Sequence, residues 1–442
     1  MMKKLLFLIL ILTSSLIRSD DLISIYEEAL IKDPNFNLNK ADLKLNKEFL
    51  NQARSALGPR LNLSGNTNWN EYYQERELQN DYNTFSYNLN FTQPIFRLDS
   101  WFQSRRAKNN FDAAEARFAY QQQDLIIRVT RAYFKVLSAR SSLKTAQATE
   151  KAFENRYQQI LERFNLGSAS RIELAEAKAA FNGATSERVL AEGNLDISFE
   201  EINSIVGRKV TLIAPLSETI NLSMPLGNLE NIVEAGIQNN FLIKEAKSRL
   251  QASQSNTKSK VANLLPKVDA SANANRRTSK QYTFDGLDSD LDLPFFIPQE
   301  TENRNFSLQF SLPLFTSGLN SSQRRQALIE EVKSEEQLVL IQRNVTQEIR
   351  SLHSAIRTAR LNVESLEASL ESTKDALDAT RLGYELSSRN LIDLLQAERS
   401  FADVQNRLSQ ARYSYLITYL QFKQATGALD PTDLIAVNNN LE

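Results

Sequence analysis

The side chains that could carry out bond chemistry are few in this chain of 442 residues. Cysteine is absent, which excludes disulfides, thiolate nucleophiles and iron–sulfur clusters, and His353 is the single histidine. The two closest glycines, Gly58 and Gly65, lie seven positions apart, so neither a GxGxxG turn nor a phosphate-binding P-loop is present. The sequence therefore predicts no enzyme, no metal centre and no cofactor.

One acidic cluster lies in the segment 276–304, where four aspartates precede Pro294-Phe295-Phe296. The aspartates are Asp285, Asp288, Asp290 and Asp292. Calcium binding and recognition by an external agent are two interpretations of such a segment. The spacing lacks the ligand pattern of a dedicated calcium loop, which favours a third interpretation, a solvated external loop.

The bulk charge and the N-terminus indicate a cellular compartment. The net charge of −1 argues against a nucleic-acid partner, whose phosphates attract a basic face. Lys3-Lys4 precede a short apolar run, Leu5 to Leu12, which is followed by Thr13-Ser14-Ser15 and by Ser19. This order is typical of a secretory signal peptide, here 1–19. A membrane anchor is the weaker alternative, because a spanning helix needs about 20 apolar residues.

The chain repeats one pattern twice. Gly58-Pro59-Arg60-Leu61 recurs as Leu265-Pro266-Lys267-Val268, and Gln93-Pro94-Ile95-Phe96 recurs as Leu312-Pro313-Leu314-Phe315. The repeat predicts two related halves, 20–220 and 221–428, followed by a tail, 429–442. Since each half switches between helical and strand periodicity, the repeat is not a solenoid unit.

Long helices are predicted in both halves. No proline falls between Phe96 and Ala214 or between Leu314 and Asp430, and apolar residues recur at steps of three and four. These patterns predict helices at 98–165 and 319–385, followed by helices at 170–206 and 390–427. Each long helix would extend about 100 Å at 1.5 Å per residue, which no globular core requires.

Four strands are predicted at 60–70, 85–93, 267–276 and 305–313. Apolar residues alternate there with Asn, Ser and Gln, and the polar positions carry little charge. That pattern favours membrane strands around a wet lumen over a half-buried soluble hairpin. Four strands cannot close a barrel, and an open edge cannot remain in lipid. Several copies must therefore pool their strands, and three copies would give twelve.

These features together resemble the TolC family of outer-membrane efflux ducts. The resemblance rests on the signal peptide, the duplicated helix–hairpin–helix plan, Pro94-Ile95-Phe96, Pro313-Leu314-Phe315 and the run from Gly383 to Leu395. It covers essentially the whole mature chain. The resemblance implies a mainly α-helical homotrimer with a twelve-stranded outer-membrane β-barrel and a long periplasmic coiled-coil tunnel. The second-half run departs from the family at Ser387, where glycine is common.

The resemblance also implies functional positions. In the family an acidic residue in the first-half turn pairs with a tyrosine and an arginine of the second half, and the matching residues are Glu173, Tyr384 and Arg389. Glu173 replaces a shorter aspartate. Asp393 matches a lumen-facing acidic ring at the constriction, and Gln396 replaces its second acidic residue. Without the resemblance these residues read as an ordinary solvated helix face.

The sequence thus predicts a passive exit duct in the bacterial outer membrane that extends into the periplasm. Its partners would be a periplasmic adaptor, an inner-membrane ABC or proton-driven transporter, and outer-membrane lipid. Trp101 with Arg105-Arg106 reads either as an anchor at the membrane interface or as plain surface. A soluble periplasmic coiled-coil adaptor or scaffold is the alternative function.

Overall fold

The computed structural model describes residues 20–74, 77–215, 228–282, 300–386 and 388–438. The predicted signal peptide, the four aspartates of the acidic loop and Ser387 lie outside the described residues. No described helix is long and apolar enough to cross a membrane.

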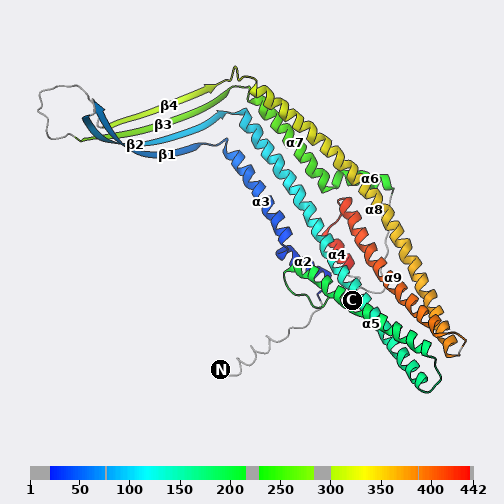
Figure 1. Cartoon of the computed structure of the whole chain (residues 1–442). Coiled ribbons are helices and arrows are strands. Elements are labelled where there is room, and N and C mark those ends of the chain that lie inside the picture. Colours follow the sequence, from blue (N-terminus) through cyan, green and yellow to red (C-terminus); the bar gives the residue numbers. More distant parts are fainter. Residues whose placement is uncertain (1–19, 75–76, 216–227, 283–299, 387, 439–442) are drawn as a thin grey trace, which may run out of the picture. The chain divides into compact units, whose positions relative to one another are not determined.

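The two halves of the chain have the same order of elements (Figure 1), and their helices have nearly the same lengths. The first half contains α2 (Leu22–Lys32), α3 (Pro34–Ser55), β1 (Arg60–Gln74), β2 (Glu77–Phe96), α4 (Leu98–Asn165) and α5 (Arg171–Val206). The second half contains α6 (Leu229–Asn239), α7 (Phe241–Ala262), β3 (Lys267–Tyr282), β4 (Glu300–Ser311), α8 (Leu319–Glu385) and α9 (Leu391–Ala425), and α10 (Pro431–Asn438) follows. The long helices have 68 and 67 residues, and the helices after them have 36 and 35.

The chain divides into two compact units, and each draws on both halves. The helical unit comprises Met1–Asp42, Ala116–Lys244 and Val339–Glu442, of which the described part begins at Asp20. The strand unit comprises Leu43–Glu115 and Glu245–Leu338. The sequence repeat therefore does not mark the boundary of a folding unit.

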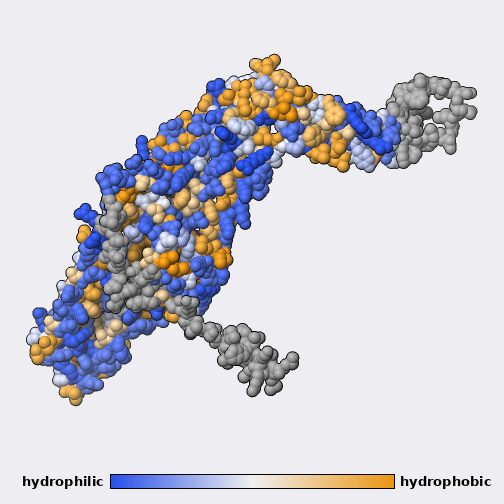
Figure 2. Space-filling view, turned by 180° about the vertical axis from the view of Figure 1, so that it is seen from behind, coloured by the Kyte–Doolittle hydropathy of each residue, from blue (hydrophilic) through white to orange (hydrophobic). Residues whose placement is uncertain are grey.

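The strand unit contains one antiparallel sheet in the order β1-β2-β3-β4, whose strands lie side by side in Figure 1. In two neighbouring rows the register aligns residues of one kind across all four strands. One row on the polar face consists of Asn62, Asn90, Asn273 and Asn305. The neighbouring row on the apolar face consists of Leu61, Phe91, Ala272 and Phe306. Figure 2 shows hydrophobic residues gathered along the sheet and where it meets the helices.

Apolar positions at coiled-coil spacing form the core of the helical unit. In α4 the buried residues include Leu125, Val129, Ala132, Val136, Phe153 and Ile160, and in α8 they include Val345, Ile349, Ile356, Val363, Leu366 and Leu377. Glu150, a polar interruption of this seam, forms an ion pair of 2.8 Å with Arg188 of α5. The seam stays continuous because its one charged residue is neutralised by a neighbouring helix.

Buried polar contacts fix the middle of the helical unit. The Asp33 carboxylate is 3% exposed, caps α3 by accepting from the Phe36 N–H at 3.0 Å, and accepts from Arg128 Nη2 of α4 at 2.6 Å. The Tyr133 hydroxyl donates to the Ala214 carbonyl at 2.7 Å, and burial raises the pKa of this hydroxyl. In the second half Asn240 takes the capping position of Asp33 and donates to the Ala425 carbonyl at 2.8 Å.

Candidate functional site at the helical turns

Two tight turns carry the residues that the sequence singled out. The first joins α4 to α5 and uses Gly167 at φ 77°, a left-handed conformation that glycine adopts without strain. The Ser168 N–H donates to the Arg163 carbonyl at 2.8 Å, and the Gly167 N–H donates to the Phe164 carbonyl at 2.9 Å. These two bonds form a Schellman motif, which ends α4 sharply and lets the chain reverse.

Glu173 lies in the first turn of α5 and forms a capping box with Ser170. Ser170 Oγ accepts from the Glu173 N–H at 3.1 Å, and Glu173 Oε2 accepts from the Ser170 N–H at 2.7 Å. The hydrogen bond from the Ser170 N–H lowers the pKa of the Glu173 carboxyl. One carboxylate oxygen of the predicted gate acid is therefore already used to start a helix.

The second turn joins α8 to α9 and places Arg389 at the surface. The N–H groups of Ser388 and Arg389 donate to the Gly383 carbonyl at 2.8 and 3.1 Å. A Cβ on Gly383 would lie 2.8 Å from Arg389 Cγ, so this glycine lets the arginine stem cross the turn. Arg389 Nη1 is 3.9 Å from the Asp393 carboxylate, and both side chains are exposed.

Glu173 and Asp393 hold equivalent positions in the two halves, each three residues after the N-cap of its helix. Ser170 caps α5 and Asn390 caps α9, where Asn390 Oδ1 accepts from the Asp393 N–H at 2.8 Å. The longer glutamate reaches back to its cap, whereas the shorter aspartate lies nearest to Arg389. Gln396 is exposed one turn beyond Asp393. One repeated acidic position thus plays two structural roles.

Tyr384 contacts two arginines of α4. Its hydroxyl accepts from Arg163 Nη1 at 3.4 Å, and the Arg156 guanidinium lies 4.7 Å from the centre of its ring. Among the described residues of one copy, no contact joins Glu173 to Tyr384 or to Arg389. The pairing of Glu173 with Arg389 stays a prediction about neighbouring copies.

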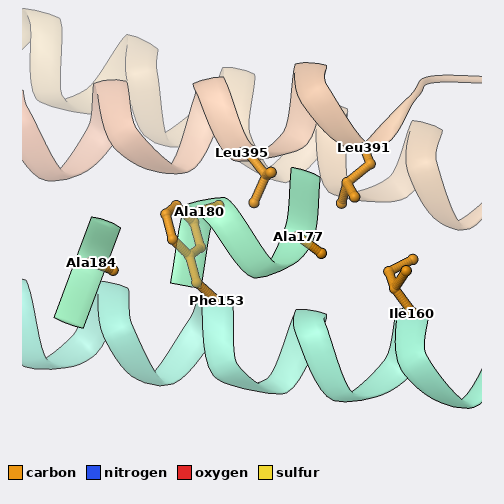
Figure 3. Packing of buried hydrophobic residues seen from close by; sticks show 7 residues of the cluster. All are labelled: Phe153, Ile160, Ala177, Ala180, Ala184, Leu391 and Leu395. Atoms are coloured by element: carbon orange, nitrogen blue, oxygen red, sulfur yellow. The ribbon is translucent and has the colours of Figure 1, made fainter. Parts of the chain in front are cut away.

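A small apolar cluster holds the two turns together beneath these polar groups (Figure 3). It joins Phe153 and Ile160 of α4, three alanines of α5, and Leu391 and Leu395 of α9. Tyr384 packs against its edge. Since alanine lets backbones approach closely, α5 packs near both partner helices at this cluster.

Sequence reasoning missed Arg156, Arg163 and Glu398. Glu398 of α9 is 12% exposed, lies 3.9 Å from Arg381 of α8, and its Oε2 has no hydrogen-bond partner among the described residues. Burial raises the pKa of its carboxyl, and the charges of Arg156 and Arg381 oppose that rise. The seven-residue spacing of Arg156 and Arg163 places both on one face of α4, the one signal that the sequence offered.

Comparisons with known proteins agree with this geometry. A family model described as Outer membrane efflux protein matches residues 25–208 and 232–428. The outer membrane protein TolC of Escherichia coli is 30% identical to this chain, over 100% of the chain and 90% of that protein. The alkaline protease secretion protein AprF of Pseudomonas aeruginosa is 24% identical, over 94% and 86%. The outer membrane channel CmeC of Campylobacter jejuni aligns with a TM-score of 0.79 at 18% identity, over 95% and 90%.

The long helical hairpins and the four-stranded sheet are those of an outer-membrane channel. The chain belongs to the outer membrane efflux protein family, whose model matches once in each half. It is an exit duct of the outer membrane that reaches into the periplasm. The predicted family, fold class, duct function and location are confirmed.

Proposed function

We propose that three copies form one duct, with a twelve-stranded barrel in the outer membrane and a periplasmic tunnel of helices. The open edges of the sheet carry this proposal, since β1 pairs only with β2 and β4 only with β3 in the described strands. Lipid cannot hydrogen-bond an unpaired strand edge, so both edges need a partner strand. Eight strands from two copies would leave an interior filled by side chains, whereas twelve from three copies leave a conduit.

The polar face of the sheet suits the lumen of such a barrel. Asn273 Nδ2 donates to Asn88 Oδ1 at 2.8 Å across β2 and β3, and the hydroxyls of Ser271 and Ser307 lie 2.6 Å apart across β3 and β4. Amides and hydroxyls bind water without imposing a charge. The lumen therefore passes substrates of differing charge, and selection of cargo falls to the proteins that deliver it.

The trimer is tested by mass measurement in mild detergent together with Leu89→Arg. Leu89 lies exposed on the apolar face of β2, and an arginine that faces lipid costs up to about 2–4 kcal/mol, depending on its depth. We expect wild-type trimers and no assembled Leu89→Arg barrel in the outer membrane. Asn88→Arg, one residue away on the polar face, is the matched control and should assemble. Wild-type monomers, or normal assembly of Leu89→Arg, would contradict the proposal.

We infer that a periplasmic adaptor and an inner-membrane ABC or proton-driven transporter complete the system, in drug efflux or in type I secretion. The presence of a protease secretion protein among the relatives supports secretion, and the family supports efflux. Because the chain lacks cysteine, single-cysteine variants report contacts without background. Ser168→Cys at the first turn should cross-link to the adaptor, and Ser307→Cys in β4 should not. Equal cross-linking of both variants would contradict the proposal that the adaptor binds at the turns.

We propose that Glu173, Tyr384 and Arg389 close the periplasmic end through contacts between neighbouring copies, with Asp393 and Gln396 lining the constriction. All five lie at the two turns of one unit, and among the described residues the one ion pair of the Arg389 guanidinium is a 3.9 Å approach to Asp393. Adaptor binding to an open arrangement would shift the population of the turns. Weak exposed contacts suit such a gate because a small difference in the adaptor's binding free energy between the open and closed arrangements can open it.

The gate is tested by single-channel conductance in planar bilayers. Tyr384→Phe combined with Arg389→Ala should raise conductance without changing the mass of the trimer. Arg407→Ala, which removes an exposed arginine farther along α9, should leave conductance unchanged. Intact trimers with wild-type conductance in the double variant would place the gate elsewhere along the tunnel.

A further inference from the structure

The ends of the helices next to the sheet concentrate positive charge. The segments 51–60, 97–110, 256–269 and 312–328 hold eleven basic residues and two aspartates, although the whole chain has a net charge of −1. The basic residues, called the basic collar below, are Arg54, Arg60, Arg97, Arg105, Arg106, Lys108, Lys258, Lys260, Lys267, Arg324 and Arg325. All of them belong to the strand unit. Balanced charge in the chain as a whole therefore conceals a strong local excess.

The two aspartates are already neutralised inside the unit. Asp269 of β3 accepts two hydrogen bonds from Arg97, from Nε at 2.9 Å and from Nη2 at 2.6 Å. Asp99 accepts from Lys267 Nζ at 2.8 Å. Lys108 pairs with Asp112, and Arg106 donates to Asn256. The remaining collar residues have no acidic partner in the part of the chain that the structure describes, namely Arg54, Arg60, Arg105, Lys258, Lys260, Arg324 and Arg325.

An exposed apolar rim lies beside the collar, at the ends of the strands and the starts of the long helices. Leu314 and Phe315 are 89% and 87% exposed, and Ile95, Phe96 and Trp101 are exposed as well. The Arg105 guanidinium lies 4.7 Å from the centre of the Trp101 ring. Aromatic residues beside cations are typical of the boundary between hydrocarbon and headgroups, where an apolar body and a charged tip are both satisfied. The strand unit thus changes from apolar to basic over a few residues.

The duplication places the same feature in both halves. Arg105-Arg106 and Arg324-Arg325 are 219 residues apart, the same offset that relates Pro94 to Pro313. Arg105 is about 10 Å from the start of α4 and Arg324 about 8 Å from the start of α8, at 1.5 Å per residue. Charges within about one screening length of the membrane-facing ends of these helices, about 8 Å at physiological salt, can attract anions there.

We propose that the basic collar binds the phosphate headgroups of anionic phospholipids in the periplasmic leaflet of the outer membrane. Lysine and arginine next to a membrane segment attract acidic lipid electrostatically, and the apolar rim sets their depth. The inference rests on the outer-membrane location and not on the gate. An acidic segment of a periplasmic protein is the competing occupant, which the rim disfavours because it offers hydrocarbon contacts beside the charges.

The test compares purified full-length protein in nanodiscs of phosphatidylcholine alone and of phosphatidylcholine with phosphatidylglycerol. Lipids retained after detergent extraction are counted by native mass spectrometry. We expect wild-type protein to retain phosphatidylglycerol several-fold over phosphatidylcholine, and 0.5 M salt to reduce that preference. Arg105→Gln with Arg324→Gln should lose most of the preference. Arg343→Gln with Arg357→Gln, two exposed arginines of α8 outside the collar, should keep it.

Equal retention of the two lipids by wild-type protein, or equal loss in both double variants, overturns the proposal. An unchanged lipid preference with reduced adaptor binding in the collar variant also overturns it and assigns the collar to a protein. Oligomer mass and conductance are recorded on the same samples. A failure of the proposed trimeric duct can therefore be distinguished from a failure of the proposed lipid binding. If the first pair of substitutions prevents assembly, Lys258→Gln with Arg325→Gln repeats the test.

Discussion

The middle of the helical unit and its two turns use the same kinds of side chain under opposite conditions. In the middle, the Asp33 carboxylate is 3% exposed and is held by Arg128, whose own side chain is 27% exposed. At the second turn, Arg389 and Asp393 are 64% and 39% exposed and 3.9 Å apart. A buried charge that loses its partner destabilises the fold strongly, whereas an exposed pair contributes about 0–1 kcal/mol. The comparison teaches that the middle is fixed while the turns can be rearranged at low cost.

Arg128→Ala gives the largest expected effect. It leaves the Asp33 carboxylate buried without its cation, and we expect a loss of about 3–5 kcal/mol in the free energy of unfolding. The matched control is Lys135→Ala on the same helix, α4, which removes an exposed ion pair with Glu201 of α5 and should cost less than about 1 kcal/mol. Denaturant titration of the detergent-solubilised protein measures both. Equal losses of stability in the two variants would contradict the view that the buried pair matters more to the fold than the exposed pair.

Removing the helix cap at the first turn comes next. Ser170→Ala deletes the hydroxyl that accepts from the Glu173 N–H and should cost about 1 kcal/mol of local stability. Glu173→Gln keeps a side chain that can accept from the Ser170 N–H but removes the charge. Hydrogen exchange near residue 173 should therefore accelerate in Ser170→Ala and not in Glu173→Gln. If Glu173→Gln also raises conductance, the charge acts in the gate and not merely in the cap.

Charge at the constriction should change selectivity with little effect on stability. Asp393→Asn removes one carboxylate from each copy and should lower the preference for cations. Gln396→Glu adds a carboxylate one turn further along the same helix and should raise that preference. Reversal potentials in asymmetric salt measure both variants. Shifts of the same sign would show that the two residues do not face one lumen.

The smallest expected effect concerns Glu398 and its dependence on pH. Because burial raises the pKa of this carboxyl above its ordinary value of 4.5, the folded state binds its proton more tightly than the unfolded state. The contribution of this group is therefore fully present below the unfolded pKa and is lost as pH rises through the folded pKa. Glu398→Gln should be slightly more stable than wild type above this window and equal to it below. A variant that loses stability at neutral pH would show that the arginines stabilise the charged form overall.

The local sequence predicted the bounds of the long helices more closely than the bounds of the strands. The two long helices run over 98–165 and 319–385, as predicted, because proline landmarks precede them and turn residues follow them. The strands extend beyond their predicted outer ends: β2 begins at Glu77 and β3 continues to Tyr282. Charged and amide residues are frequent in these extensions, so the apolar alternation did not reach them.

The positions of the two turns were predictable, but the side-chain contacts at them were not. The turn positions follow from the repeat, yet the partners of Tyr384 depend on which faces of α4 and α8 meet. Arg156, Arg163 and Glu398 have their roles only through that packing, and no local pattern reports it. The capping box was readable, since Ser170 and Glu173 have the required spacing. What remained hidden was that this box occupies one oxygen of the predicted gate acid.

The open edges of β1 and β4 also bear on how the duct is made. The helical unit buries its core within one copy, but the sheet of a lone copy leaves both edges unpaired and residues such as Phe306 and Leu308 exposed. Unpaired strand edges are templates for aggregation, and assembly between copies is concentration-dependent. The newly exported single copy is therefore the vulnerable species. We therefore expect its lifetime before it meets other copies to limit how much protein reaches the membrane.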